Sequence, residues 1–93
     1  MSKEEKITEL LTQFDGWERE GEYLKKTFMF SSFEIAVKSM MDLVPAINQL
    51  NHHPEWENVY NKVRVCLTTH DENELTDKDF GLLRLIEHHW SKS

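Results

Sequence analysis

Two adjacent histidines, His52 and His53, lie in the stretch NHHPEW at residues 51–56. Imidazole is the side chain whose unperturbed pKa, about 6.5, allows it to give or take a proton near neutrality. A third histidine, His70, closes the next β-like run, and Asp79 follows on the next expected helix. These residue types predict an enzyme that moves protons with histidines and uses no metal.

Each of these residues also has a structural explanation. Polar side chains collect at helix C-termini, where a protonated histidine interacts favourably with the helix dipole. His70 could be a solvated strand terminus, and Asp79 could cap a helix by accepting backbone hydrogen bonds, a role that can coexist with a place in the site. Pro54 and Trp56 favour the functional interpretation of the histidine pair, because they fix the direction in which the chain leaves the helix.

A zinc site and a nucleophilic triad are the chemical alternatives. Three histidines and a carboxylate could bind zinc, but adjacent histidines at a helix end rarely both reach one ion, and the sequence has no HExxH or CxxC element. No serine or cysteine lies in a turn typical of a nucleophile, and Cys66 is expected to pack inertly within a strand. We therefore expect neither metal nor triad, and expect His88 and His89 to be solvated.

Length and charge restrict the class of protein. The 93 residues predict a single domain over residues 1–93. Its 17 acidic against 11 basic residues give a net charge of −6, which argues against direct nucleic-acid binding, since that needs clustered lysine and arginine. One cysteine cannot form an internal disulfide, and no signal peptide or membrane-spanning run is evident, so we expect a cytoplasmic protein.

The first half of the chain predicts a helix, a hairpin and a long helix. Ser2 and Glu5 have capping-box spacing at the start of a helix over 2–14, and strands are expected over 17–20 and 23–30. The long helix should run over 33–51, with Ser31 and Glu34 as its capping box and a bend at Pro45. The apolar stripe expected to cover the sheet comprises Phe33, Val37, Met40, Val44 and Ile47, widened by Ala36 and Met41.

The second half predicts another hairpin and a last helix. Strands are expected over 57–60 and 63–69, joined by a turn at 61–62, and a helix over 76–89 should bury Phe80, Leu83, Ile86 and Trp90. The fold class is therefore α+β, a four-stranded antiparallel sheet with three helices packed on one face, in the order α-β-β-α-β-β-α. Its unpaired edge strands make edge-to-edge dimerisation plausible.

Several of these segments together resemble the pterin-4a-carbinolamine dehydratases. The resemblance rests on NHHPEW at 51–56, NVYNKV at 58–63, Thr69-His70, Leu75-Thr76 and Asp79, and is close over residues 44–86. It implies a metal-independent hydro-lyase that converts 4a-hydroxytetrahydropterin to quinonoid dihydropterin and water, within tetrahydrobiopterin recycling. The pterin is then the substrate, and no cofactor is implied.

The resemblance also assigns roles to particular residues. The family's three catalytic histidines match His52, His53 and His70. We expect the first and third to transfer the hydroxyl and ring protons, with the choice of acid and base open, and His53 to orient the pterin. The substrate-binding candidates are Asn51, His52, His53, Thr68, Thr69, His70, Asp71 and Asp79. The family usually has glutamate where this chain has Asn48, a position from which a carboxylate could orient or charge an imidazole.

The resemblance implies a homo-oligomer, either a dimer or a tetramer. It also suggests two alternative functions. One is service as a dimerisation partner of a transcription factor through the long helix, and the other is a role with another reduced pterin, such as the molybdenum cofactor.

Overall fold

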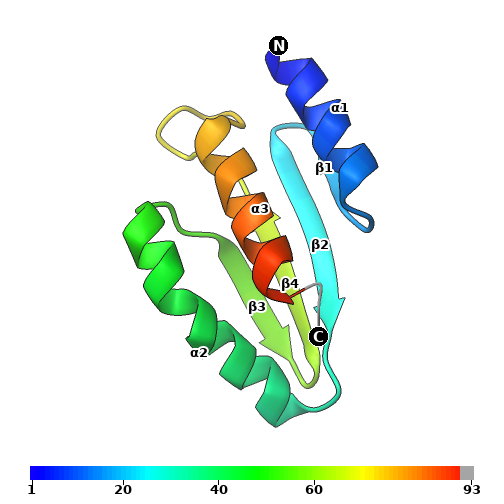
Figure 1. Cartoon of the computed structure of the whole chain (residues 1–93), viewed down its shortest axis with the longest axis vertical. Helices are drawn as coiled ribbons and strands as arrows, with labels where there is room; N and C mark the ends of the chain where they lie inside the picture. Colours follow the sequence, from blue (N-terminus) through cyan, green and yellow to red (C-terminus); the bar gives the residue numbers. More distant parts are fainter. Residues whose placement is uncertain (91–93) are drawn as a thin grey trace.

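The structure, a computed structural model, describes residues 1–90 and has three helices on one face of a four-stranded antiparallel sheet. This is the α+β fold, and the element order, expected from the sequence. The helices are α1 (Lys3–Gln13), α2 (Phe33–Leu50) and α3 (Asp77–Trp90), and the strands are β1 (Glu18–Glu20), β2 (Tyr23–Met29), β3 (Glu55–Val59) and β4 (Lys62–Leu67) (Figure 1). Across residues 1–90, none of the helices has the length and hydropathy of a membrane-spanning segment.

The strands follow the order β1-β2-β4-β3, so the two hairpins join through their second strands. The β2–β4 register runs from Leu24 opposite Leu67 to Met29 opposite Lys62. Inward-facing residues of β4 are fully buried under the helices, whereas alternate residues such as Arg64 lie on a face that the helices leave open. The edges of the sheet are β1 and β3.

Helix α3 carries much of the core, as its apolar periodicity predicted. Phe80, Leu83, Ile86 and Trp90 are all buried. The Trp90 ring meets Phe28 and Phe30 edge-on and stacks on Trp56, with centroids 5.1, 5.4 and 6.0 Å away. Through Trp56, α3 therefore packs directly against the edge strand that follows the histidine pair.

Helix α2 presents only part of the expected stripe to the sheet. Its buried residues are Leu43 and two of the expected positions, Ala36 and Ile47. Phe33, Val37 and Met41 are 48%, 37% and 65% exposed, so the expected stripe was wrong for these three positions. The apolar residues of α2 extend around more of its circumference than the sheet can cover, and the small Ala36 side chain lies against the core. The helix is capped by the Ser32 hydroxyl, one residue after the expected Ser31, and it continues through Pro45.

The second hairpin begins and turns earlier than expected. Strand β3 starts at Glu55, directly after Pro54, and its turn lies at Tyr60 and Asn61, one residue before the expected pair. Tyr60 adopts a positive φ of 53°. The side-chain amide of Asn58 donates to the backbone carbonyls of Tyr60 and Lys62 across the turn. This shift places Glu55 inside the sheet, opposite Cys66 of β4.

A charged pair occupies the helix-covered side of the sheet. Nζ of Lys26 lies 2.5 Å from Oε2 of Glu87 in α3, and the same oxygen accepts a 2.7 Å hydrogen bond from the Trp17 indole. The two charged side chains are only 16% and 4% exposed. The lysine that interrupts the apolar row of β2 is therefore balanced by a partner 61 residues away.

Candidate active site

The end of α2, the end of β4 and the start of α3 lie at one end of the sheet (Figure 1). Asn51 ends α2 in the left-handed conformation with φ 58°, and its backbone N–H donates to the carbonyls of Ile47 and Asn48. Asparagine is one of the few non-glycine residues that adopt this conformation readily. His52 and His53 therefore lie in a tight connection between this cap and Pro54.

His52 and Asp79 form a histidine–carboxylate pair. Nε2 of His52 lies 2.7 Å from Oδ1 of Asp79, and the two side chains are 12% and 0% exposed. A carboxylate accepts hydrogen bonds, so Nε2 carries the hydrogen and Nδ1 is the ring nitrogen left to exchange a proton with a ligand. The pair brings together two residues that the sequence analysis selected separately.

The other oxygen of Asp79 is held within the protein. Oδ2 accepts from the Thr69 hydroxyl at 2.7 Å and from the Thr76 backbone amide at 3.0 Å, while the two threonine hydroxyls lie 2.7 Å apart. Asp79 thus caps the start of α3, as its spacing from Thr76 predicted, and also contacts His52. The Asp79 carboxylate therefore both caps α3 and positions the His52 ring.

His53 has a neutral partner. Its Nε2 lies 3.1 Å from Oδ1 of Asn48, one turn back in α2, and its side chain is exposed. The residue that replaces the family's usual glutamate therefore still contacts an imidazole, through an amide oxygen in place of a carboxylate.

His70 is paired with a residue that the sequence analysis did not select. Its Nε2 lies 2.6 Å from Oε2 of Glu55, with side chains 67% and 51% exposed. The loop that carries His70 is closed by backbone hydrogen bonds between Thr69 and Glu74, and Asn73 adopts a φ of 54° within it. His70 therefore extends from a short closed loop toward the first residue of β3.

Glu22, in the turn of the first hairpin, forms hydrogen bonds with residues on both sides of the loop that carries His70. Its carboxylate accepts from Lys3 at 2.6 Å, from the Leu75 amide at 2.9 Å and from Arg19 at 3.0 Å. The Lys3 hydrogen bond, followed by that from Leu75, lowers the pKa of Glu22 to about 2. The Glu22 backbone carbonyl also accepts the Thr68 hydroxyl at 2.7 Å. Groups distant from the histidines thus fix the loop that bears His70.

The structure joins three of the residues selected from the sequence. Asp79 contacts both His52 and Thr69, and His70 follows Thr69 in the chain. The Thr68 and Thr69 hydroxyls are buried and bonded to protein atoms, whereas Asp71 is exposed in the loop. Contact with substrate stays a prediction for Asn51, His52, His53, Thr68, Thr69, His70, Asp71 and Asp79 alike.

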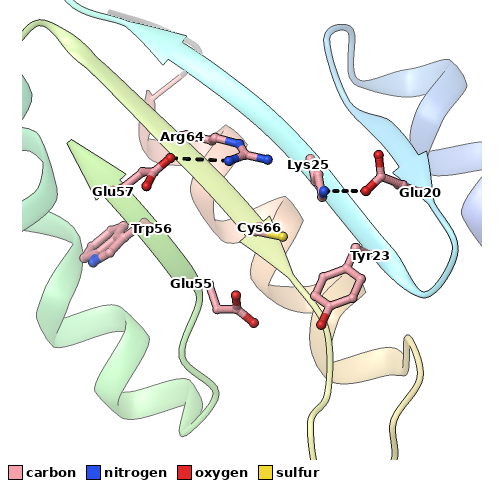
Figure 2. A pocket seen from close by; sticks show the side chains of 8 residues that line it. All are labelled: Glu20, Tyr23, Lys25, Glu55, Trp56, Glu57, Arg64 and Cys66. Carbon is pink, nitrogen blue, oxygen red and sulfur yellow. Dashed lines mark hydrogen bonds and ion pairs between the residues drawn. The ribbon is translucent and has the colours of Figure 1, made fainter. Parts of the chain in front are cut away.

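The open face of the sheet has a hollow beside Glu55 (Figure 2). Lys25 pairs there with Glu20 at 2.7 Å, and Arg64 pairs with Glu57 at 3.3 Å. Burial, and then the charge of Glu55, raise the pKa of the central Cys66 thiol. The hollow has a volume of about 430 Å³ and is lined by Glu20, Tyr23, Lys25, Glu55, Trp56, Glu57, Arg64 and Cys66. Within residues 1–90, no group of three His, Cys, Asp or Glu side chains is arranged to hold a metal ion.

Fold and site together define an α+β protein with a histidine–carboxylate site suited to proton transfer. Comparison with known families matches residues 1–89 to the family described as "Pterin 4 alpha carbinolamine dehydratase". The chain belongs to the pterin-4a-carbinolamine dehydratase family. The resemblance noted in the sequence is thereby confirmed.

Individual relatives of the chain carry pterin dehydratase names, in agreement with the family assignment. A putative pterin-4-alpha-carbinolamine dehydratase of Rhizobium meliloti (strain 1021) is 47% identical over 78 residues, covering 82% of this chain and 75% of the relative. One of Christiangramia forsetii is 38% identical over 84 residues, covering 90% and 87%. The crystal structure of a transcriptional coactivator/pterin dehydratase from Brucella melitensis superposes with a TM-score of 0.85 at 34% identity, covering 97% of both chains. The names of the curated relatives denote hydro-lyases.

Proposed function

We propose that this chain dehydrates 4a-hydroxytetrahydropterin to quinonoid dihydropterin and water, by histidine acid–base catalysis, in the recycling of tetrahydrobiopterin. The observation that carries the proposal is the pairing of His52 with the fully buried Asp79 carboxylate, which leaves one imidazole nitrogen for proton exchange. Family membership supplies the substrate class. The proposal includes a cytoplasmic location and a homo-oligomeric state.

The reaction needs two proton transfers. The bond between carbon 4a and the hydroxyl oxygen breaks while that oxygen gains a proton and leaves as water. The neighbouring ring nitrogen loses its proton, and its electron pair forms the new carbon–nitrogen double bond. Positioned acid and base groups each contribute about 10²–10⁴-fold. His52 and His70 perform the two transfers, while His53, held by Asn48, orients the pterin ring.

The test is the decay rate of freshly generated 4a-hydroxytetrahydropterin, followed by absorbance with and without the protein. We expect acceleration by the native chain and its loss in His52→Ala and His70→Ala. His88→Ala is the control matched to His70→Ala, because both imidazoles are exposed but His88 lies in the last turn of α3. Decay at the buffer rate with the native chain would refute the proposal.

A second candidate function is binding of a partner through α2. Phe33, Val37 and Met41 are exposed on this helix, and the Brucella relative is named as a coactivator. Exposed apolar residues gathered on one element are typical of interaction surfaces. Met41→Glu should abolish helix-mediated association and leave dehydration intact, with His52→Ala doing the reverse. Equal loss of both properties in both variants would argue against separate roles.

A further inference from the structure

We infer that Glu55 is a positioning residue that holds the His70 imidazole for proton transfer, an inference that rests on the proposed function. Nε2 of His70 lies 2.6 Å from Oε2 of Glu55. A carboxylate at that nitrogen fixes the hydrogen on Nε2 and leaves Nδ1 for the ligand, as Asp79 does for His52.

The basic residues near Glu55 pair with other carboxylates, whereas Glu55 pairs with His70. The two cations of the open-face hollow, Lys25 and Arg64, pair with Glu20 and Glu57. Figure 2 shows these two pairs joined and Glu55 apart from both, beside Cys66. Among the residues that the structure describes, Glu55 thus differs from the other lining glutamates in facing a histidine.

The chain connects the two histidine–carboxylate pairs. Glu55 lies three residues after His52, and His70 directly follows Thr69, which donates to Asp79. Each histidine is therefore held by a carboxylate from the opposite segment of the site. A displacement of the segment that carries His52 and Glu55 would disturb both imidazoles together.

Exposure determines where the effect of Glu55 should be seen. The side chains of Glu55 and His70 are 51% and 67% exposed, and exposed ion pairs contribute little to folding stability. A planar ligand bound over His70 would exclude water and strengthen the pair, since electrostatic interactions grow as the local dielectric falls. We therefore expect Glu55 to affect turnover more than stability or substrate affinity.

The experiment compares Glu55→Ala with Glu57→Ala. The control residue lies two positions along β3 on the same face, is similarly exposed and pairs with Arg64. We expect a fall in kcat of about 10- to 100-fold for Glu55→Ala, with KM and the midpoint of unfolding unchanged. Glu57→Ala should keep the native kcat, and Glu55→Gln, which retains an acceptor oxygen, should recover part of the loss.

A double variant tests whether Glu55 acts through His70. The kcat of His70→Ala combined with Glu55→Ala should equal that of His70→Ala alone, because the carboxylate then has no imidazole to hold. Multiplying losses, or native kcat in Glu55→Ala, would overturn the inference while the proposed function stands.

A readout without substrate separates this inference from the proposed function. The ring ¹⁵N shifts of His70 report which nitrogen carries the hydrogen, and they should change in Glu55→Ala but not in Glu57→Ala. If the native chain shows no dehydration, the proposed function fails, and these shifts still decide whether Glu55 holds the ring. Shifts identical in all three proteins would overturn the inference.

Discussion

Replacing Asp79 by asparagine should separate the fold of the site from its chemistry. The asparagine oxygen can still accept from the Thr69 hydroxyl and the Thr76 amide, but its NH₂ group then faces Nε2 of His52. An NH₂ group can only donate, so the His52 hydrogen must move to Nδ1, and the nitrogen available to the ligand loses its lone pair. We expect kcat to fall by about 10²–10⁴-fold, the range for losing a general acid or base.

The stability cost of Asp79→Asn should be small by comparison. Hydrogen bonds to a charged group contribute about 1.5–3 kcal/mol and neutral ones about 0.5–1.5, so we expect a loss of about 1–2 kcal/mol. Asp79→Ala leaves three donors without their acceptor, at about 1–3 kcal/mol each where they stay buried, and should be clearly less stable at a similar kcat. Urea unfolding and ¹⁵N spectra of His52 measure the two effects. A kcat for Asp79→Asn within about threefold of native would refute this reasoning, given the range above.

Three further predictions concern stability. Glu87→Ala should lower the free energy of unfolding by about 3–5 kcal/mol, because it leaves the Lys26 charge without a carboxylate. Glu87→Leu with Lys26→Met should lose less, about 1–3 kcal/mol, because no charge is left unpaired and the cost is that of the buried Trp17 indole N–H without its acceptor. Equal midpoints in urea for native and Glu87→Ala would contradict the first expectation. The hydrogen bond from Lys3 lowers the pKa of Glu22 to about 2. The ion pairs of Glu22 therefore stabilise the fold fully above the pKa of this group in the unfolded chain, near 4.5, and the stabilisation is lost as the pH falls toward 2. The stabilities of native and Glu22→Gln proteins should therefore converge across that window, and a constant difference would count against the assignment. Asn51→Ala should cost about 1 kcal/mol, since alanine tolerates the left-handed conformation poorly, while Asn51→Gly should be near neutral in the same unfolding assay.

Periodicity predicted the elements because each packs one face only. Alternation at Val63, Val65 and Leu67 identified β4, and helical spacing identified the buried side of α3. The face of α2 was misjudged only at Phe33, Val37 and Met41, because these residues fit a helical stripe as well as the buried Ala36 and Ile47 do. Spacing along one helix does not specify which part of a wide apolar surface meets the sheet.

The candidate site was predictable where residue type alone signals chemistry. His52 and His70 stood out as proton-transfer groups and Asp79 as a carboxylate that could cap a helix or join the site, and the structure pairs His52 with Asp79. Glu55 could not be selected in this way, because its role depends on the strand beginning directly after Pro54. A two-residue error in that boundary concealed it.

Cys66 offers a way to observe the site spectroscopically. It is the only cysteine of the chain and lies opposite Glu55 in the β3–β4 register. Because burial raises the pKa of its thiol, alkylation should be slow at neutral pH and require brief exposure to mild alkali. A small fluorinated reagent attached there would place one reporter nucleus beside the carboxylate that contacts His70. Its resonance should move when a pterin binds to the native chain, and the size of that shift should change in Glu55→Ala.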